Sequence, residues 1–457
     1  MSAPMPHVLA IPYPAQGHVI PLLEIAQLLA KHGLRVTFVN TDFNHSRIVR
    51  AVERMDFLGD QIRLVSIPDG LGPGENRNDL EKITEVMFRV MPGKLQKLIE
   101  EINRKEEDRI TCVLSDACVS WPIEVAVKMK IPRAAFCPFS AAVFASGLAV
   151  PKLIKDGVIT DDGTVIGQQT FRLAPDMPVM GATNLLWTCM GASFSQRIVL
   201  DLMVGYSVSL KLADRVICNS SSVLEPAALE FIPQMKPIGP LLAGDRFGDP
   251  GGYFWVEDTS CLKWLDEQPP NSVVYVAFGS FTVFDRTQFQ ELALGLELLR
   301  RPFLWVVRPD ICEETDELYP EGFQERVSGR GKMVGWAPQQ KVLSHPSVAC
   351  FVSHCGWNST MEATSNGVPL LCWPYFADQF LNESYICDKW KTGLKFDRGD
   401  GGIVTRDEIK LKVHLLLDNG EFSKQTRDLK EKVKASVREG GESHTNFIDF
   451  VEWIKAL

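Results

Sequence analysis

Two side chains in the first third of the chain could take part in proton transfer. His18 follows the apolar run His7 to Pro12 and begins a segment with helical spacing. Its imidazole group would accept a proton at cellular pH, because the ordinary pKa of histidine is about 6.5. A base needs a partner that orients it, and Asp116 directly follows a second apolar run, Ile110 to Ser115. The ordinary alternatives are a surface histidine and an aspartate that caps the next helix.

Anion binding is indicated where another apolar run, Val348 to Val352, leads into a turn at Gly356. A helix is expected to follow, and the N–H groups of its first turn, with the positive end of the helix dipole, would bind a diphosphate. His354, at the strand end, could donate a hydrogen bond to the same phosphates. Glu362, about one turn into the helix, could accept hydrogen bonds from ribose hydroxyls. The alternative is an ordinary strand, turn and helix with Asn358 as a cap.

The elements that would position these residues are short β-rich runs that alternate with helical patterns. The expected strands are His7–Pro12, Arg35–Val39, Ile62–Ile67, Ile110–Ser115, Arg133–Phe136, Arg215–Asn219, Val273–Phe278, Phe303–Val307, Val348–Val352 and Val368–Trp373. Such alternation indicates parallel sheets with crossover helices, and the runs form two series. We therefore predict an α/β fold of two facing Rossmann-like domains. Ligands of open parallel sheets bind beyond the carboxyl ends of the strands, so the site is expected in the inter-domain cleft.

The break between the two series predicts the domain boundaries. A stretch rich in Gly, Pro and Asp begins near residue 242 and indicates a linker. We expect an N-terminal domain over residues 1–240, a linker over 241–271 and a C-terminal domain over 272–440. Residues 441–457 are expected to form a helix that packs back on the N-terminal domain.

The composition is that of a globular protein and argues against several other classes. Of the 457 residues, 45% are hydrophobic and 23% are charged, and the net charge of −9 argues against a nucleic-acid partner. The eleven cysteines lack C-x-x-C spacing, so reduced thiols are expected rather than a zinc site. Neither a signal peptide nor an apolar run of about 18 residues is visible, so we expect a cytoplasmic location without a membrane span. We also expect a monomer.

Three groups of residues in the second half carry a family resemblance. They are Trp336-Ala337-Pro338-Gln339, His354-Cys355-Gly356-Trp357-Asn358-Ser359 and Asp378-Gln379. Together they resemble the signature box of the plant secondary-metabolite UDP-glycosyltransferases, and the tract has the length of that box. The resemblance implies the GT-B fold and inverting transfer from a UDP-sugar. Ser353 stands where threonine is usual, and no chemistry depends on that difference.

The resemblance implies which residues bind the donor. They are Ser280, Trp336, Ala337, Gln339, His354, Gly356, Trp357, Asn358, Ser359, Glu362, Asp378 and Gln379. Trp336 would stack on the uracil, with Gln339 beside the nucleotide. His354, Asn358 and Ser359 would hold the diphosphate, and Glu362 the ribose. Trp357, Asp378 and Gln379 would contact the sugar hydroxyls, and a closing Gln favours UDP-glucose. In this family the C-terminal domain binds the UDP-sugar and the N-terminal domain binds the acceptor.

The N-terminal half also resembles the family. Pro14-Ala-Gln-Gly17-His18 matches its N-terminal motif, which implies that His18 is the general base. Asp116 matches the second member of the family's dyad, whose carboxylate holds the imidazole tautomer and stabilises the cation. Candidate acceptor-binding residues are Tyr13, Phe139, Phe144, Trp187 and Phe376.

The predicted reaction is inverting transfer of glucose from UDP-glucose to a hydroxyl of a small lipophilic acceptor, such as a flavonoid, another phenolic or a terpenoid. The UDP-sugar is a co-substrate, no other cofactor is expected, and the donor half has no Asp-x-Asp pair that would hold a metal. Transfer to carbon and a non-catalytic nucleotide-sugar binding protein stay open. An NAD-dependent oxidoreductase is disfavoured, because Gly70-Leu-Gly72-Pro-Gly74 is not G-x-G-x-x-G.

Overall fold

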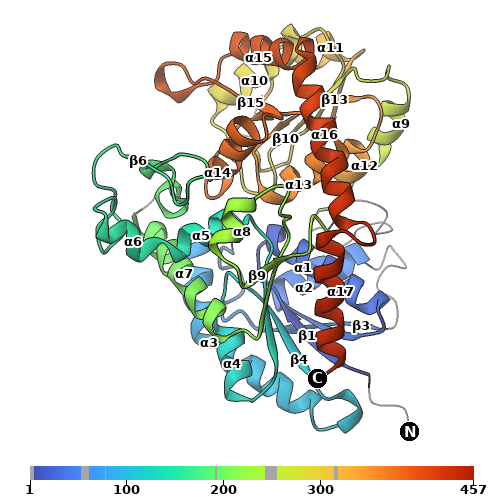
Figure 1. Ribbon diagram of the computed structural model, residues 1–457. Coiled ribbons are helices and arrows are strands. Elements are labelled where there is room, and N and C mark those ends of the chain that lie inside the picture. The colour runs from blue at the N-terminus through green and yellow to red at the C-terminus, as the bar shows by residue number, and fades with distance from the viewer. Residues whose placement is uncertain (1–4, 53–60, 78, 191–192, 242–254, 313–317) are drawn as a thin grey trace. The chain divides into compact units, whose positions relative to one another are not determined.

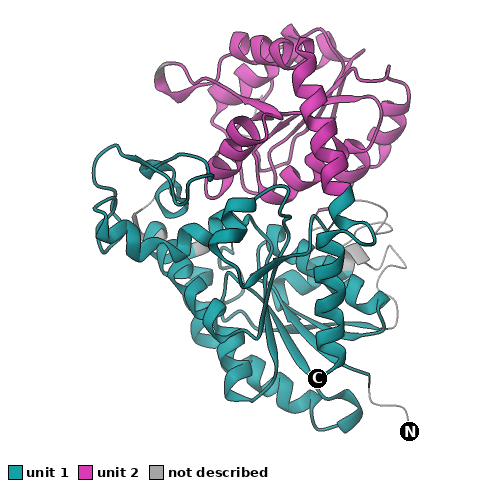
Figure 2. Ribbon diagram, viewed as in Figure 1, with its two compact units in different colours: residues 1–254, 435–457 teal, residues 255–434 magenta. Residues whose placement is uncertain are grey.

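The chain forms two α/β units, as the alternation of strands and helices predicted (Figure 2). The computed structural model describes residues 5–52, 61–77, 79–190, 193–241, 255–312 and 318–457. Unit 1 comprises residues 1–254 and 435–457, and unit 2 comprises residues 255–434. Each unit has one parallel sheet with helices, so the predicted Rossmann-like architecture is confirmed.

The sheet of unit 1 has seven strands in the order β3-β2-β1-β4-β5-β8-β9, all parallel. The strands are β1 His7–Ile11, β2 Arg35–Thr41, β3 Ile62–Ile67, β4 Cys112–Asp116, β5 Arg133–Cys137, β8 Arg215–Cys218 and β9 Met235–Pro237. A two-stranded antiparallel ribbon joins β6 Thr170–Phe171 to β7 Met180–Gly181. The strand order reverses between β1 and β4, which is where ligands bind in folds of this kind.

The helices of unit 1 pack on this sheet through apolar side chains. They are α1 Gln16–Lys31, α2 Asp42–Val52, α3 Leu80–Ile102, α4 Trp121–Lys128, α5 Ala141–Leu148, α6 Val150–Lys155, α7 Ser193–Leu212, α8 Pro226–Phe231 and α17 Glu442–Lys455, with short 3-10 turns η1 Glu106–Asp108, η2 Ala182–Asn184 and η3 Leu186–Cys189. Helix α17, red in Figure 1, contributes Phe447, Phe450 and Ile454 to the same core as β1 and α1. The last helix is therefore part of unit 1.

The sheet of unit 2 has six parallel strands in the order β12-β11-β10-β13-β14-β15. They are β10 Val273–Ala277, β11 Phe303–Val306, β12 Gly331–Val334, β13 Val348–Ser353, β14 Leu370–Cys372 and β15 Gly393–Lys395. The helices are α9 Ser260–Asp266, α10 Arg286–Leu298, α11 Phe323–Val327, α12 Gln339–Leu343, α13 Trp357–Asn366, α14 Gln379–Ser384, the π-helix η4 Tyr385–Lys389, the 3-10 turn η5 Asp400–Gly402, α15 Arg406–Asp418 and α16 Gly420–Val437. Here the strand order reverses between β10 and β13.

Besides β6 and β7 of the short ribbon, the sequence analysis missed three strands at the edges of the parallel sheets. They are β9 in unit 1 and β12 and β15 in unit 2, each three or four residues long. Edge strands are short and carry a weak apolar pattern, so they give little signal in a sequence. The predicted linker also differs in part, because α9 packs against α12 and β12 within unit 2. The rest of that linker includes residues 242–254, which lie outside the described residues.

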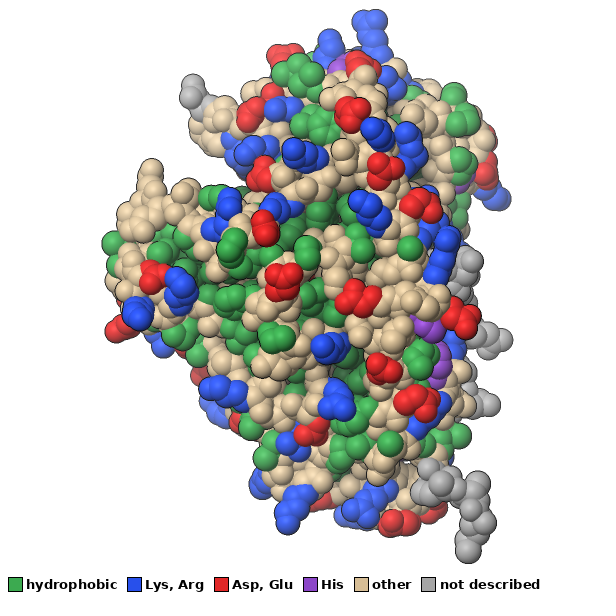
Figure 3. All heavy atoms as spheres, viewed as in Figure 1, with side chains coloured by type: hydrophobic (Ala, Val, Ile, Leu, Met, Phe, Trp, Pro, Cys, Tyr) green, Lys and Arg blue, Asp and Glu red, His purple; other side chains and the backbone are tan. Residues whose placement is uncertain are grey.

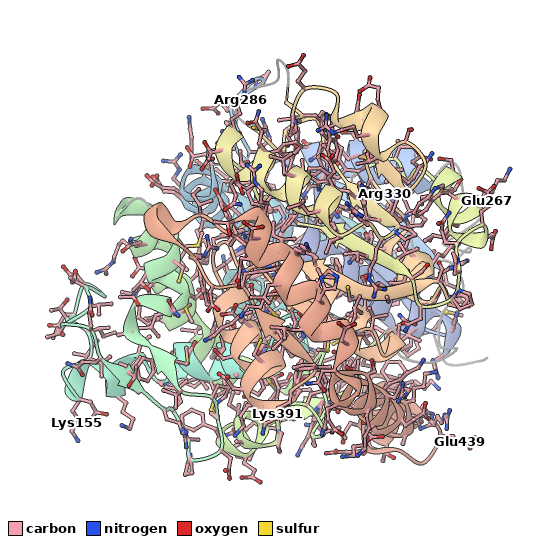
Figure 4. All side chains as sticks on the ribbon, turned by 90° about the horizontal axis from the view of Figure 1, so that it is seen from above. Lys155, Glu267, Arg286, Arg330, Lys391 and Glu439 are labelled. Atoms are coloured by element: carbon pink, nitrogen blue, oxygen red, sulfur yellow. The ribbon has the colours of Figure 1, made fainter. Side chains whose placement is uncertain are left out.

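The visible surface carries charges of both signs. Basic and acidic side chains are interspersed on the face in Figure 3, without a large field of one sign. Lys155, Glu267 and Glu439 are exposed and point away from the ribbon (Figure 4). None of the helices in the described ranges is long and apolar enough to cross a membrane.

Candidate active site

His18 and Asp116 are brought together by the pairing of two neighbouring strands in unit 1. His18 is the third residue of α1, which follows β1, and Asp116 is the last residue of β4. Strands β1 and β4 run parallel with Ile11 opposite Ser115, so their carboxyl ends lie side by side. Two residues far apart in the sequence thus meet where the strand order reverses.

The buried carboxylate of Asp116 accepts three hydrogen bonds. Oδ2 accepts from Nδ1 of His18 at 2.7 Å and from the backbone N–H of Tyr13 at 3.2 Å, and Oδ1 accepts from the N–H of Cys118 at 2.8 Å. An ionised carboxylate can only accept, so Nδ1 of His18 carries the hydrogen. Nε2 is then the nitrogen that can take up a proton. The imidazole group is 22% exposed and can be reached by a small molecule.

Asp116 is not the cap of the helix that follows it. Helix α4 begins at Trp121, and its N-cap residue is Ser120. The alternative of an ordinary helix-capping aspartate is therefore wrong. Its carboxylate instead connects the start of α1 to the turn after β4.

Two aromatic rings lie next to the imidazole ring. The ring centroids of Tyr13 and Phe139 are 5.2 Å and 5.9 Å from that of His18. The hydroxyl of Tyr13 is hydrogen-bonded to that of Thr84 at 3.1 Å, and burial raises the pKa of the tyrosine well above its ordinary value. Tyr13 and Phe139 therefore give His18 aromatic neighbours, in addition to the carboxylate of Asp116.

Two of the proposed acceptor-binding residues are part of the core instead. Phe144 is fully buried and stacks on Tyr206, with ring centroids 4.9 Å apart. Trp187 is also buried, and its indole N–H donates to the carbonyl of Gly163 at 2.9 Å. Both side chains are buried in the core of unit 1, so the structure does not support either as a contact of the acceptor. Tyr206, which the sequence analysis missed, stacks on both Phe139 and Phe144 and supports the ring beside His18.

The thiol of Cys118 lies close to the same pair. The possible ligand atoms of His18, Asp116 and Cys118 are within 4.8 Å of one another, the one such group found in the described part of the chain. Burial raises the pKa of Cys118 well above that of a free thiol. The carboxylate oxygens already accept three N–H groups, so hydrogen bonds to Asp116 account for the grouping of these residues.

In unit 2 the predicted anion-binding residues also lie where the strand order reverses. Strands β10 and β13 pair with Ala277 opposite Ser353, so the turn Gly279-Ser280 after β10 lies beside the turn His354–Gly356 after β13. A Cβ atom on Gly279 or Gly356 would come within 2.5 Å of Nε2 of His354. The imidazole ring is thus packed between two glycines, and any larger residue at either position would displace it.

The imidazole group of His354 is neutral at cellular pH. Burial, helped by the charge of Arg308, lowers its pKa to about 4. Its Nδ1 atom is buried and has no hydrogen-bond partner among the described residues. A neutral imidazole can donate one hydrogen bond to a phosphate oxygen without adding a positive charge.

A buried arginine fixes the turn that faces His354. The guanidinium group of Arg308 donates to the carbonyl of Gly279, to the carbonyl of Thr282 at 2.7 Å and to the carboxylate of Asp310 at 3.0 Å. Gly279 has a φ angle of 65°, which side chains other than glycine rarely adopt. The sequence analysis missed Arg308. This residue follows the carboxyl end of strand β11, as His18 follows the carboxyl end of β1.

The start of α13 has no side-chain cap. The N-cap residue is Gly356, and Trp357 and Asn358 are the first two helical residues. The alternative in which Asn358 caps this helix is therefore wrong. A helix of ten residues whose cap is glycine leaves the approach to its positive end open to an anion.

A hydrogen-bonded cluster surrounds Gln339, the first residue of α12. Its amide nitrogen donates to Oγ of Ser359 at 2.8 Å and to Oε2 of Glu362 at 2.7 Å, and its amide oxygen accepts from the hydroxyl of Tyr275 at 3.2 Å. Burial raises the pKa of Glu362 to about 7. The carboxylate is therefore poised between its two protonation states near neutral pH. Tyr275, on β10, was not among the predicted donor-binding residues.

Trp336 and the residues after it form a further part of the site. The ring of Trp336 is partly exposed and stacks on Trp255, with centroids 6.1 Å apart and an interplanar angle of 23°. Ala337 is buried directly after it. The sequence analysis did not identify Trp255, whose ring lies beside that of Trp336.

The pair Asp378-Gln379 begins helix α14. Oδ2 of Asp378 accepts from the side chain of Asn382 at 2.8 Å, and the amide oxygen of Gln379 accepts from the N–H groups of Tyr375 and Phe376 at 2.7 Å and 3.0 Å. Gln379 thereby holds the loop before its own helix. The partly exposed ring of Phe376 lies edge-on to Phe281, with centroids 6.1 Å apart.

The side chain of Trp357 faces the interior of unit 2. It is 4% exposed and packs against Trp390, with ring centroids 6.3 Å apart. A ligand can therefore reach only its backbone, as the first residue of α13.

Comparison with known proteins gives consistent results over the whole chain. Residues 256–422 match the family described as UDP-glucoronosyl and UDP-glucosyl transferase. The chain is 45% identical to UDP-glycosyltransferase 83A1 of Arabidopsis thaliana, over 99% of this chain and 97% of that protein. It is similar to Os79 of O. sativa solved in complex with UDP, with a TM-score of 0.81, 29% identity and coverage of 98% and 100%. A UDP-glucosyltransferase of Polygonum tinctorium capable of glucosylating indoxyl has a TM-score of 0.84, 27% identity and full coverage of both chains.

Proposed function

Because the chain belongs to the plant UDP-glycosyltransferases and is therefore a glycosyltransferase of the GT-B fold, we propose that it transfers glucose from UDP-glucose to a hydroxyl of a small lipophilic acceptor. The product would be a β-glucoside and UDP. A phenolic, a flavonoid or a terpenoid would fit as the acceptor. The relative of Polygonum tinctorium, which glucosylates indoxyl, supports a small aromatic acceptor.

The observation that carries this proposal is the 2.7 Å hydrogen bond between Nδ1 of His18 and Oδ2 of Asp116. It directs Nε2 of His18 to accept a proton and places a carboxylate where it stabilises the imidazolium. A protein that only bound nucleotide sugars would have no use for an oriented base. The geometry therefore favours transfer over the non-catalytic alternative.

The chemical step would be a direct displacement. The acceptor oxygen would attack the anomeric carbon as its proton passes to Nε2 of His18, and the bond between that carbon and the diphosphate oxygen would break. Attack opposite the leaving group converts the α-linked donor to a β-glucoside. Charge that grows on the leaving UDP would be stabilised by the neutral His354, by Ser280 and by the start of α13.

The donor would be held by the residues collected at the β10 and β13 strand ends. Uracil would stack on the ring of Trp336, which itself lies against Trp255. The carboxylate of Glu362 would accept hydrogen bonds from the ribose. The amide oxygen of Gln379 is already used by two backbone N–H groups, so a contact to glucose hydroxyls would come from its amide nitrogen.

Screening the full chain with UDP-glucose against hydroxylated aromatics and terpenoids tests the proposal. We expect at least one acid-labile monoglucoside, with a β anomeric configuration by NMR and release of UDP. The same reactions with UDP-galactose and UDP-glucuronic acid should be slower. An acid-stable product would place the new bond on carbon, and faster transfer of another sugar would refute the assignment of the donor.

The pH dependence of donor binding should report the protonation state of Glu362. Its pKa of about 7 means that it is mostly protonated at pH 6 and mostly ionised at pH 8. An ionised carboxylate accepts a stronger hydrogen bond from ribose, so we expect UDP-glucose to bind about fivefold more tightly at pH 8 than at pH 6. Calorimetry over this range would measure it, and Glu362→Gln should bind more weakly with no such rise.

A matched control is Glu383→Gln. Burial raises the pKa of Glu383 to about 7 as well, so it titrates in the same range, but Glu383 is not among the described hydrogen-bond partners of Gln339. His354 does not interfere, because its pKa of about 4 keeps it neutral throughout. A rise in affinity that persists in Glu362→Gln and disappears in Glu383→Gln would show that the ribose contact is assigned wrongly.

A further inference from the structure

Two thiols in unit 2 lie close enough to react with each other. Cys372 is the last residue of β14, and Cys387 lies in the π-helix η4. Their sulfur atoms are 3.7 Å apart, and all eleven cysteines of the chain are free thiols. Cys372 is buried, whereas Cys387 is partly exposed. One member of the pair can thus be reached from solution, whereas the other is buried and also lies beside the thiol of Cys355.

We propose that Cys372 and Cys387 form a reversible disulfide bond that acts on the donor-binding segment between them. A disulfide has an S–S distance of about 2.05 Å, so the two sulfurs must approach by less than 2 Å. A rotation of the partly exposed Cys387 side chain with a small shift of η4 would supply this movement.

The oxidation balances with a peroxide as the two-electron oxidant. Hydrogen peroxide converts the Cys387 thiol to a sulfenic acid and releases one water. The Cys372 sulfur then attacks the sulfenic sulfur, the S–S bond forms and a second water leaves. Burial raises the pKa of Cys372 well above that of a free thiol, so its thiolate is scarce and the second step is slow at neutral pH. A thiol reductant reverses the reaction.

Asp378 and Gln379 lie between Cys372 and Cys387 in the sequence, in the loop that the disulfide would close. Helix α14 begins at Gln379 and continues directly into η4, which carries Cys387. Gln379 also holds the backbone of Tyr375 and Phe376. A movement of η4 toward the end of β14 is therefore transmitted along one continuous helix to the two residues proposed to contact the sugar.

The expected consequence, which rests on the proposed function, is weaker use of the donor. Displacing sugar-binding residues by about 1 Å should raise the KM for UDP-glucose on the order of tenfold. The KM for the acceptor would rise as well if Phe376 contacts the acceptor, because Gln379 holds the backbone of Phe376.

Peptide mapping of the peroxide-treated full chain tests the bond itself. Cleavage after glutamate cuts at Glu362, Glu383 and Glu408, which puts Cys372 and Cys387 alone on two separate peptides. After alkylation of the remaining thiols, we expect these two peptides to be linked, and dithiothreitol to release them and restore the KM for UDP-glucose. The absence of the linked peptide at peroxide concentrations that oxidise Cys189 would refute the proposal.

Matched variants separate this bond from general oxidation. Cys387→Ser should lose both the linked peptide and the rise in KM, whereas Cys189→Ser, which removes a partly exposed thiol of unit 1, should keep both. A KM that still rises in oxidised Cys387→Ser would contradict the proposed effect. Mass spectrometry detects the linked peptide whichever UDP-sugar the enzyme uses. A failure of the proposed disulfide can therefore be distinguished from a failure of the proposed function.

Discussion

Replacing His18 by alanine should lower kcat by about 10³-fold while UDP continues to bind. A positioned general base contributes on the order of 10²- to 10⁴-fold, and the oriented Nε2 of His18 is the atom proposed to take the acceptor proton. UDP binding should persist, because the residues proposed to hold it all belong to unit 2 and His18 belongs to unit 1. Steady-state rates with the best acceptor of the screen and calorimetry with UDP would measure the two effects.

His32→Ala is the matched control for this substitution. His32 caps the other end of α1 and packs on Phe447, so its loss perturbs the same helix without touching Asp116. We expect its kcat to stay within about twofold of the wild-type value, with a small decrease in Tm. Turnover by His18→Ala within about tenfold of the wild-type rate would refute the assignment of the base.

Replacing Asp116 by asparagine should lower kcat by about 10²- to 10⁴-fold, although the side chain keeps its size. The carboxylate accepts three N–H groups through both oxygens. An amide has one donor group, which must then face either Cys118 or the pair formed by Tyr13 and His18. In the second orientation the amide donates to Nδ1 of His18, so the imidazole hydrogen moves to Nε2. Nε2 can then no longer take up the proton of the acceptor. The rate measurement is the same as for His18→Ala.

A double mutant distinguishes this role from a purely structural one. If Asp116 acts through His18, then His18→Ala with Asp116→Asn should be no slower than His18→Ala alone. Thermal unfolding of the two single variants should be compared, because the buried amide leaves one N–H group without an acceptor. Rate losses that multiply in the double mutant would show that the two residues act separately.

Most strands that could be predicted from the sequence lie inside the sheets. The runs beginning at His7, Val273 and Val348 are apolar and bounded by turn residues, and they became the central strands β1, β10 and β13. The missed strands of the two parallel sheets are edge strands of three or four residues, too short to show a clear apolar pattern. The family shown by the comparisons also removes the oxidoreductase alternative.

The side chains at the donor end of unit 2 could be identified from the sequence because they are local. Gly356, Asn358 and Glu362 lie on one turn and one helix, where sequence spacing decides geometry directly. Arg308 and Trp255 were missed because each acts on this region from a distant segment. No periodicity connects an arginine after β11 to a carbonyl after β10.

The sequence by itself determined the α/β class, the order of the central strands along the chain and the residue types available for donor binding. Tertiary structure alone decided that His18 meets Asp116, because parallel pairing of β1 with β4 brings their carboxyl ends together. It also decided that Phe144 and Trp187 belong to the core, whereas Phe139 lies beside His18. An aromatic residue has the same sequence signature in either place, and its burial depends on partners such as Tyr206 that only the folded chain supplies.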